Sequence, residues 1–301
     1  MITVDKVNKH FDSFHCLKNL SMNVPTGSVY GLVGPNGAGK STILRHICGV
    51  YRPDDGEILL DGEPIFENPA QKARIFSIPD EFYHFSSAST RDMMKFFRGI
   101  YPKFDARRYH ALAEAFPEVK EQLPLRRLSK GMKKQAAFWL ALSCRPDYLL
   151  LDEPVDGLDP VMRRQVWSLI LQDVAEYGTT VLVSSHNLRE LEDVCDQVGI
   201  LSAGTMLLER SLQDLQGSVV KMQVVFQEKE PPALPEDFPV LHTAQVGRIT
   251  TLIVRGTPEE VTNRLAVYSP ILMDALPLSL EEIFIYELGG EQEYAVRDII
   301  L

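Results

Sequence analysis

The stretch Val29-Tyr30-Gly31-Leu32-Val33 runs directly into Gly34-Pro35-Asn36-Gly37-Ala38-Gly39-Lys40-Ser41-Thr42. The first part is a short apolar run that ends at a glycine, which is typical of a buried strand. The second part has the spacing G-x-x-x-x-G-K-S of a phosphate-binding loop. From Lys40 to Cys48 the apolar spacing is helical, and Gly49 is placed as a stop signal. A strand, a glycine-rich loop and a helix in this order predict a nucleotide-binding α/β fold.

The residue types of this loop suit a phosphate ligand. Glycines allow the backbone N–H groups to point inward, and the N-terminus of the following helix adds partial positive charge. Lys40 can reach the β- and γ-phosphates, and Ser41 offers a hydroxyl to Mg²⁺. We therefore expect Lys40 to act in catalysis and the whole loop to bind nucleotide, namely Gly34, Pro35, Asn36, Gly37, Ala38, Gly39, Lys40, Ser41 and Thr42.

An acidic pair follows a second apolar run. Asp152 and Glu153 come directly after Tyr148-Leu149-Leu150-Leu151, at the carboxyl end of a predicted parallel strand, where α/β proteins place their ligands. Asp152 is the predicted Mg²⁺ ligand, either direct or through water. Glu153 is the predicted base that orients or deprotonates an attacking water.

Patterns along the chain predict two domains. Residues 1–210 alternate buried strands with helices, such as the amphipathic helix Val161–Tyr177 and the strand Thr179–Ser184, which indicates a largely parallel sheet covered on both faces. Aromatic residues at helical intervals predict a helical insert at about 83–141. For residues 211–301 we expect a small α+β domain. Its predicted strands are Val219–Phe226 and Ile249–Arg255, its helices Pro258–Leu265 and Leu280–Leu288, with a proline-rich loop at Glu228–Pro239.

Composition narrows the classes of function. The net charge is −10, which disfavours a general basic surface for nucleic acid. Cys16, Cys48, Cys144 and Cys195 show no C-x-x-C spacing and sit in apolar runs, so we expect buried free thiols in a reducing cytosol. No apolar run approaches the ~20 residues of a membrane-spanning helix, and no signal peptide is visible. If the protein works at a membrane, another chain must span it.

Between the predicted strands at 29–33 and 148–151 lies the segment Leu128-Ser129-Lys130-Gly131-Met132. Together with the phosphate loop and the acidic pair, it resembles the Leu-Ser-Gly-Gly-Gln signature of ATP-binding subunits of ABC transporters. In that family the signature of one subunit caps the γ-phosphate held by the other. Lys130 and Met132 depart from the usual glycine and glutamine, while Ser129 and Gly131 remain. The resemblance implies that all four contact nucleotide, with Lys130 adding a charge contact; Ser129 also suits a helix N-cap.

Other positions match the same family. His186 corresponds to the histidine that contacts the γ-phosphate, and Asp159 ends the loop that crosses the dimer interface. Phe11 sits where the family stacks an aromatic ring on adenine, with Phe14 as the rival. Asp80 stands where the family usually has glutamine, and its carboxylate can still offer oxygen to Mg²⁺ or water. The resemblance implies catalytic roles for Glu153 and His186.

The implied fold is the ABC type of P-loop NTPase, with a parallel core, an antiparallel β portion, the helical insert and the C-terminal domain. The implied function is binding and hydrolysis of Mg-ATP at a homodimer or heterodimer interface, on the cytoplasmic face of the membrane, to drive a separate membrane-spanning subunit. Ser279-Leu280-Glu281-Glu282-Ile283-Phe284 looks like the tail of ABC-2-type exporters, and Leu128–Gln135 is similar to a Gram-positive exporter subgroup.

The alternative is a soluble ABC ATPase of translation or DNA repair. Translation factors of this family usually carry two cassettes in one chain, and repair ATPases carry a long coiled-coil insert with sustained heptads. This chain has one phosphate loop, an insert too short for a coiled coil and an acidic balance. These features favour the transporter.

Overall fold

The computed structural model describes residues 1–85, 87–228, 231–235 and 237–288. The chain divides into two compact units, the first comprising Met1–His186 and Val194–Glu209, the second Asn187–Asp193 and Arg210–Leu301. The boundary at Glu209 lies beside the one expected after residue 210. The assignment of Asn187–Asp193 to the second unit was not predicted. Residues 289–301 of the predicted C-terminal domain lie outside the described residues.

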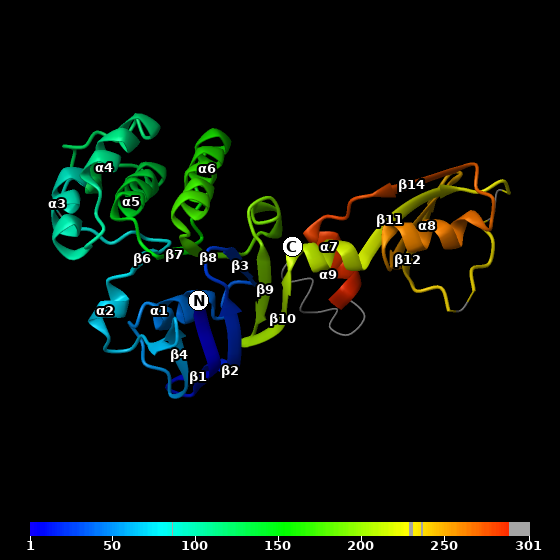
Figure 1. The fold of residues 1–301 in the computed structure, drawn as a ribbon, viewed down its shortest axis with the longest axis horizontal. Helices are drawn as coiled ribbons and strands as arrows, with labels where there is room; N and C mark the ends of the chain where they lie inside the picture. Colours follow the sequence, from blue (N-terminus) through cyan, green and yellow to red (C-terminus); the bar gives the residue numbers. More distant parts are fainter. Residues whose placement is uncertain (86, 229–230, 236, 289–301) are drawn as a thin grey trace. The chain divides into compact units, whose positions relative to one another are not determined.

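A sheet with the strand order β10-β9-β3-β8-β7-β6 forms the centre of the first unit (Figure 1). Strands β3, β8, β7 and β6 are parallel, and β9 pairs with β3 in the same direction. Every residue of β3, β7 and β8 is buried, as expected for strands covered on both faces. The carboxyl ends of these three strands therefore meet at one edge. The bounds are β3 Val29–Val33, β6 Ile75–Ile78, β7 Tyr148–Asp152, β8 Thr180–Ser185, β9 Gln197–Ser202 and β10 Thr205–Ser211.

A second sheet of this unit is antiparallel, in the order β2-β1-β4-β5. Its pairing shifts between Val4 and Val7, where Lys6 adopts a left-handed φ of 46°. This bulge interrupts the in–out alternation of β1, and the sequence pattern did not predict the first two strands. The bounds are β1 Ile2–Phe11, β2 Phe14–Val24, β4 Asp55–Leu60 and β5 Glu63–Pro64.

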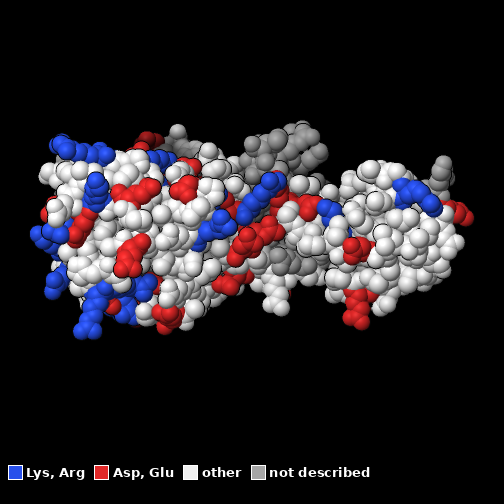
Figure 2. Space-filling model, turned by 90° about the horizontal axis from the view of Figure 1, so that it is seen from above, with Lys and Arg blue, Asp and Glu red and all other residues white. Residues whose placement is uncertain are grey.

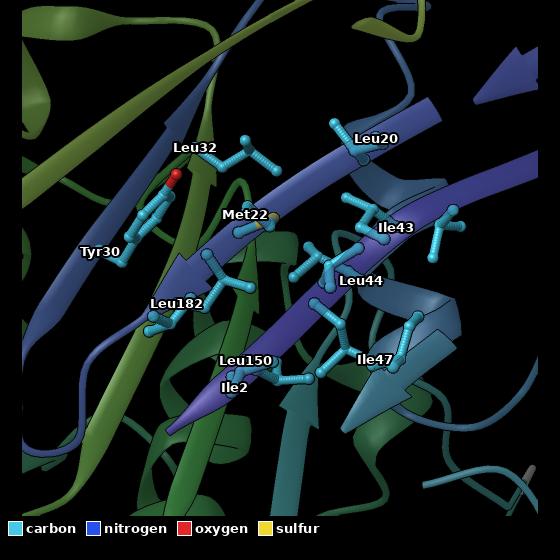
Figure 3. Close-up of a cluster of buried hydrophobic side chains, with 14 of the residues drawn as sticks. Ile2, Leu20, Met22, Tyr30, Leu32, Ile43, Leu44, Ile47, Leu150 and Leu182 are labelled. Atoms are coloured by element: carbon cyan, nitrogen blue, oxygen red, sulfur yellow. The ribbon is translucent and has the colours of Figure 1, made fainter. Parts of the chain in front are cut away.

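Helix α1 (Lys40–Ile47) packs between the two sheets (Figure 3). Its buried side chains meet residues of β1 and β2 on one side and residues of β3, β7 and β8 on the other. The phosphate loop is thus anchored by a helix that both sheets cover. The labelled members of this cluster are Ile2, Leu20, Met22, Tyr30, Leu32, Ile43, Leu44, Ile47, Leu150 and Leu182.

The predicted insert is helical and lies in the first unit (Figure 1). Helix α3 begins at a capping box formed by Ser89 and Asp92. Tyr109 of α4 stacks on Trp139 of α5, with ring centroids 4.8 Å apart, and the Trp139 indole donates to the Tyr109 carbonyl at 2.7 Å. Helix α5 ends at Cys144, beyond the expected end of the insert near Ala141. The bounds are α2 Pro69–Lys72, α3 Thr90–Ile100, α4 Ala106–Leu112, η1 Ala113–Ala115, η2 Leu125–Arg127, α5 Lys130–Cys144 and α6 Pro160–Tyr177.

The second unit contains an antiparallel sheet in the order β12-β13-β11-β14. Apolar side chains of β11 and β13 pack against Val261 and Leu265 of α8. The segment Asn187–Asp193 belongs to this unit because Arg189 pairs with Glu281, and the Leu280 N–H donates to Glu192 at 3.0 Å. The bounds are η3 Leu188–Glu190, α7 Leu212–Ser218, β11 Val219–Val225, β12 Val240–Val246, β13 Ile249–Arg255, α8 Pro258–Ala266, β14 Leu272–Leu276 and α9 Leu280–Leu288.

Three of the four cysteines are buried and Cys48 is half-buried; all four are free thiols. Within the described ranges, no helix combines the length and the apolar character needed to cross a membrane.

Candidate active site

Most of the phosphate loop, both candidate aromatic rings and three predicted carboxylates line one cavity of about 470 Å³. The loop after β3 forms its floor, the β1–β2 hairpin contributes aromatic rings, and the ends of β6 and β7 contribute carboxylates. The fold therefore brings together segments that are far apart in the sequence. The lining residues are Phe11, Phe14, Cys16, Asn36, Gly37, Ala38, Gly39, Lys40, Ser41, Thr42, Asp80, Asp152 and Glu153.

The glycines of the phosphate loop are required by its backbone. Gly37 and Gly39 have φ angles of 83° and 109°, in the region that disfavours other residues. At Gly34 a Cβ would lie 2.1 Å from the carbonyl oxygen of Leu201, so any side chain there would displace backbone. Gly39 is the N-cap of α1, and the loop thus presents the N-terminus of a helix to the cavity, a site that favours anions.

Lys40 is buried at the first position of α1. Its ammonium donates to the carbonyl oxygens of Gly34 at 2.6 Å and Pro35 at 3.3 Å, and lies 3.6 Å from Oε1 of Glu153. Burial lowers the pKa of Lys40, and the nearby Glu153 carboxylate partly opposes this shift. The ammonium is therefore held by two loop carbonyls and one carboxylate at the floor of the cavity.

Glu153 follows β7 and is constrained on several sides. Its φ of 47° lies in the left-handed region, and its N–H donates to the carbonyl of Ser184 at 3.1 Å. Oε2 of its carboxylate lies 2.9 Å from Nδ1 of His186. The Glu153 carboxylate thus lies between the Lys40 ammonium and the His186 imidazole, beside the phosphate-binding loop.

The neighbouring carboxylate, Asp152, is buried and accepts a hydrogen bond of 2.5 Å from the hydroxyl of Ser184. Ser184 was not predicted as a site residue, although a serine at the end of an apolar strand was a usable signal. This bond fixes one carboxylate oxygen of Asp152 at the cavity wall.

Asp80, which follows β6, lies between two lysines of α5. Its Oδ1 is 3.5 Å from the ammonium of Lys130 and 3.3 Å from that of Lys134. Lys134 also donates to the main-chain carbonyl of Glu153 at 2.5 Å. Lys134 was not predicted as a site residue; the signal was a lysine beside an otherwise apolar helical run. Asp80 is thus tied to the helix that carries the signature.

The signature forms the start of α5. Ser129 is the N-cap, and its hydroxyl accepts a bond from the Met132 N–H at 3.2 Å. Lys130 pairs with Asp156 at 2.9 Å, and a Cβ on Gly131 would lie 2.9 Å from the carbonyl of Gly157. The signature therefore packs closely against the loop after Glu153.

Some predicted residues lie away from the cavity. Asp159 caps α6 by accepting from the N–H groups of Val161 and Met162, each at 3.0 Å. Of the described residues, the cavity lining does not include the signature, Asp159, His186, Gly34 or Pro35. His186 and Gly34 reach it through their contacts with Glu153 and Lys40.

Both aromatic residues proposed for adenine line the cavity. Phe11 and Phe14 face each other across the β1–β2 hairpin. Phe11 is 39% exposed and packs edge-on against Tyr51, with centroids 5.5 Å apart, whereas Phe14 is 61% exposed. Phe11 is therefore not a core residue, and both rings line the same cavity as the phosphate loop.

Oxygen donors in the cavity suit a magnesium ion. Ser41 supplies a hydroxyl, and Asp152 and Asp80 supply carboxylates. Mg²⁺ in nucleotide sites takes few protein ligands and fills the rest with water and phosphate oxygens, so this sparse donor set fits it.

Comparison with known proteins gives a consistent result. The ABC transporter family model matches residues 17–156. The ABC transporter ATP-binding protein YtrB of Bacillus subtilis (strain 168) is 34% identical over 98% of this chain and 100% of its own length. The Nod factor export ATP-binding protein I of Burkholderia lata is 30% identical over 95% of this chain and 96% of its own.

Among solved structures, an ATP-binding subunit of an ABC transporter superposes with a TM-score of 0.68 and 26% identity. It covers 72% of this chain and 92% of its own. Matching motifs, fold and full-length relatives lead to one conclusion: the chain belongs to the ATP-binding proteins of the ABC transporter family, which are ATPases.

Proposed function

We propose that this chain hydrolyses Mg-ATP in the cavity described above and uses the energy to power export through a separate membrane subunit. One observation carries the proposal. The phosphate loop, the acidic pair and His186 come from separate parts of the sequence and meet around Lys40 and Glu153. Binding, charge stabilisation and a base are thus present in one place.

Each residue has a distinct role in this proposal. Lys40 leaves the loop carbonyls for the β- and γ-phosphates, and the ring of Phe11 or Phe14 stacks on adenine. Ser41, Asp152 and Asp80 would hold the magnesium ion, which neutralises phosphate charge when bound. Glu153 orients and deprotonates the attacking water, and His186 steadies the Glu153 carboxylate and reaches the γ-phosphate.

A second cassette completes the site. Ser129 and Lys130 are exposed at the N-terminus of α5, where helix N–H groups favour an anion. We propose that they cap the γ-phosphate held by another chain, either an identical copy or a related subunit. Hydrolysis removes the shared phosphate and the two cassettes separate. The closed and open arrangements form two states, and a membrane partner that binds them differently responds to the change.

The partner is proposed to dock beside Asp80. Tyr83 is 79% exposed and Phe85 is 58% exposed, and Phe85 packs edge-on against Phe96 of α3 at 5.2 Å. The two exposed rings offer apolar surface that a protein partner would cover, as contiguous apolar patches at interaction sites do. The full-length similarity to an export ATP-binding protein supports a membrane transporter as the partner and the inner face of the membrane as the location.

The alternative, a soluble ABC ATPase of translation or DNA repair, is less well supported. Two relatives that align over 98% and 95% of this chain are named as a transporter protein and an export protein. The net charge is −10, and Figure 2 shows acidic and basic side chains interspersed over the face drawn. Such a surface suits a protein partner better than a nucleic acid.

The test is purification of the tagged chain from detergent-solubilised native cells, with its companions identified by mass spectrometry. A stoichiometric polytopic membrane protein supports the transporter. Ribosomal proteins or DNA as the companions would overturn it and favour the soluble alternative.

A further inference from the structure

Lys134 is a charged residue in a place that favours an apolar one. It is 2% exposed and begins the continuously buried stretch of α5. Burying an ammonium costs free energy unless it is hydrogen-bonded and paired. Packing alone therefore does not account for a lysine here.

Two contacts compensate for the burial of this ammonium. It donates to the main-chain carbonyl of Glu153 at 2.5 Å and lies 3.3 Å from Oδ1 of Asp80. Burial lowers the pKa of Lys134, and Asp80 opposes that shift. Lys134 thus connects α5 with the segments that follow β6 and β7.

The bond to Glu153 acts on a strained backbone. Glu153 has a φ of 47°, a conformation that persists only when its surroundings hold it. Its N–H is fixed by Ser184, while its carbonyl is fixed by Lys134 and receives a longer bond, 3.4 Å, from the N–H of Asp156. Fixing the peptide groups on both sides sets the direction in which the Glu153 carboxylate points.

The ion pair with Asp80 links this backbone to the cavity. Asp80 lines the cavity and is also paired with Lys130, one helical turn before Lys134. A ligand or partner that draws Asp80 away changes the charge beside Lys134. The ammonium then has the Glu153 carbonyl as its main partner.

We propose that Lys134 is a positioning residue for ATP hydrolysis. It holds the Glu153 main chain in its strained conformation, and its ion pair with Asp80 makes this contact depend on the position of Asp80. This inference deepens the proposed function and rests on the role of Glu153 as the base. The substrate-contacting groups remain those of the cavity.

Steady-state ATP hydrolysis by the full chain tests the proposal. Lys134→Met removes the donor and the charge at similar size, and we expect kcat to fall by about tenfold or more, since small misplacements of a catalytic group are costly. KM for ATP should stay within about threefold, because the phosphate-binding loop is intact. Lys134→Arg should restore much of kcat. The matched control is Lys133→Met, which changes the neighbouring lysine of the same helix and should leave kcat unchanged.

Two further readouts separate positioning from a structural role. Lys134→Met leaves the Glu153 carbonyl and Asp80 without this partner. Because Asp80 is half exposed and can be solvated, we expect only a small fall in the thermal unfolding temperature. Amide exchange of the peptide over residues 152–158 should become faster in Lys134→Met. If Lys134→Met does not fold, Lys134→Gln is the second test. It keeps a hydrogen-bond donor, so its kcat should lie between those of wild type and a variant without the donor.

Wild-type kcat in Lys134→Met would overturn the inference. So would parallel losses of kcat, ATP affinity and stability that arginine does not rescue. Assaying Glu153→Gln beside Lys134→Met separates the failure of this inference from the failure of the proposed function. If Glu153→Gln is inactive while Lys134→Met is fully active, only this inference fails; if Glu153→Gln is active, the proposed base is wrong.

Discussion

The ammonium of Lys40 lies 3.6 Å from Oε1 of Glu153, and Oε2 of the same carboxylate lies 2.9 Å from Nδ1 of His186. The predicted phosphate ligand and the predicted base therefore contact each other directly. A γ-phosphate that draws the Lys40 ammonium away would leave Glu153 paired with His186 alone. Binding of the nucleotide and release of the base are thus linked through one contact.

Lys40→Met should weaken ATP binding strongly, because the loop loses the cation that contacts the phosphates. We expect the dissociation constant to rise by about tenfold or more, as for the loss of a hydrogen bond to a charged group. Isothermal titration calorimetry checks this. Lys18→Met, at an exposed position of β2, is the control, and equal affinity of the two variants would contradict the assignment.

Phe11→Ala should lower ATP affinity by about threefold to tenfold, the loss expected for one aromatic stacking contact. Phe14→Ala, in the facing position of the hairpin, is the matched comparison and should have the smaller effect. Titration with a fluorescent ATP analogue measures both. The reverse order would assign adenine stacking to Phe14.

Asp80→Gln should alter coupling more than nucleotide binding. The change removes the carboxylate that pairs with Lys130 and Lys134 but keeps an oxygen in the cavity. We expect ATP affinity within about threefold of wild type, with a changed stimulation of hydrolysis by the membrane partner. Equal losses of affinity and turnover would show that Asp80 acts mainly in binding.

Asp147→Asn should destabilise the protein at neutral pH more than in acid. Partial burial raises the pKa of Asp147, but its bonds from Lys103 and Arg74 lower it by more, so the net shift is downward. A carboxyl with a depressed folded pKa contributes stability above its unfolded pKa and loses that contribution as pH falls.

Urea unfolding of wild type and Asp147→Asn at about pH 7 and about pH 3 measures this. The difference in unfolding free energy should shrink at the lower pH. A difference that stays constant would mean that the ion pairs of Asp147 contribute nothing to stability.

Much of the fold follows from local patterns. Strands β3 and β7 are continuous apolar runs followed by polar motifs, and the glycines of the loop satisfy backbone needs that arise within a few residues. Because such signals are local, the sequence alone predicts Lys40 and Glu153 at one edge of a parallel sheet.

Other features depend on contacts between distant segments. The bulge at Lys6 interrupts the two-residue alternation of buried and exposed side chains in β1, so the sequence pattern does not indicate a strand there. Strand β12 is mostly exposed and shows no buried face to predict. Asn187–Asp193 joins the second unit through the pairing of Arg189 with Glu281, and no local pattern specifies that contact.

Two residues of the site could not be predicted from the sequence for the same reason. Ser184 is significant only because its hydroxyl meets Asp152 from the neighbouring strand. Lys134 looks like an ordinary helical lysine until the fold places it against Glu153 and Asp80. Partners that lie far away in sequence define both roles.

The most direct test of the account is ATP hydrolysis and ATP-dependent association by Glu153→Gln. The account predicts that turnover falls by about 10²- to 10⁴-fold, the usual contribution of a general base, while ATP still binds and the chain accumulates as an ATP-bound dimer by light scattering. Hydrolysis at the wild-type rate would contradict the account, because the carboxylate of Glu153 would then not be the base.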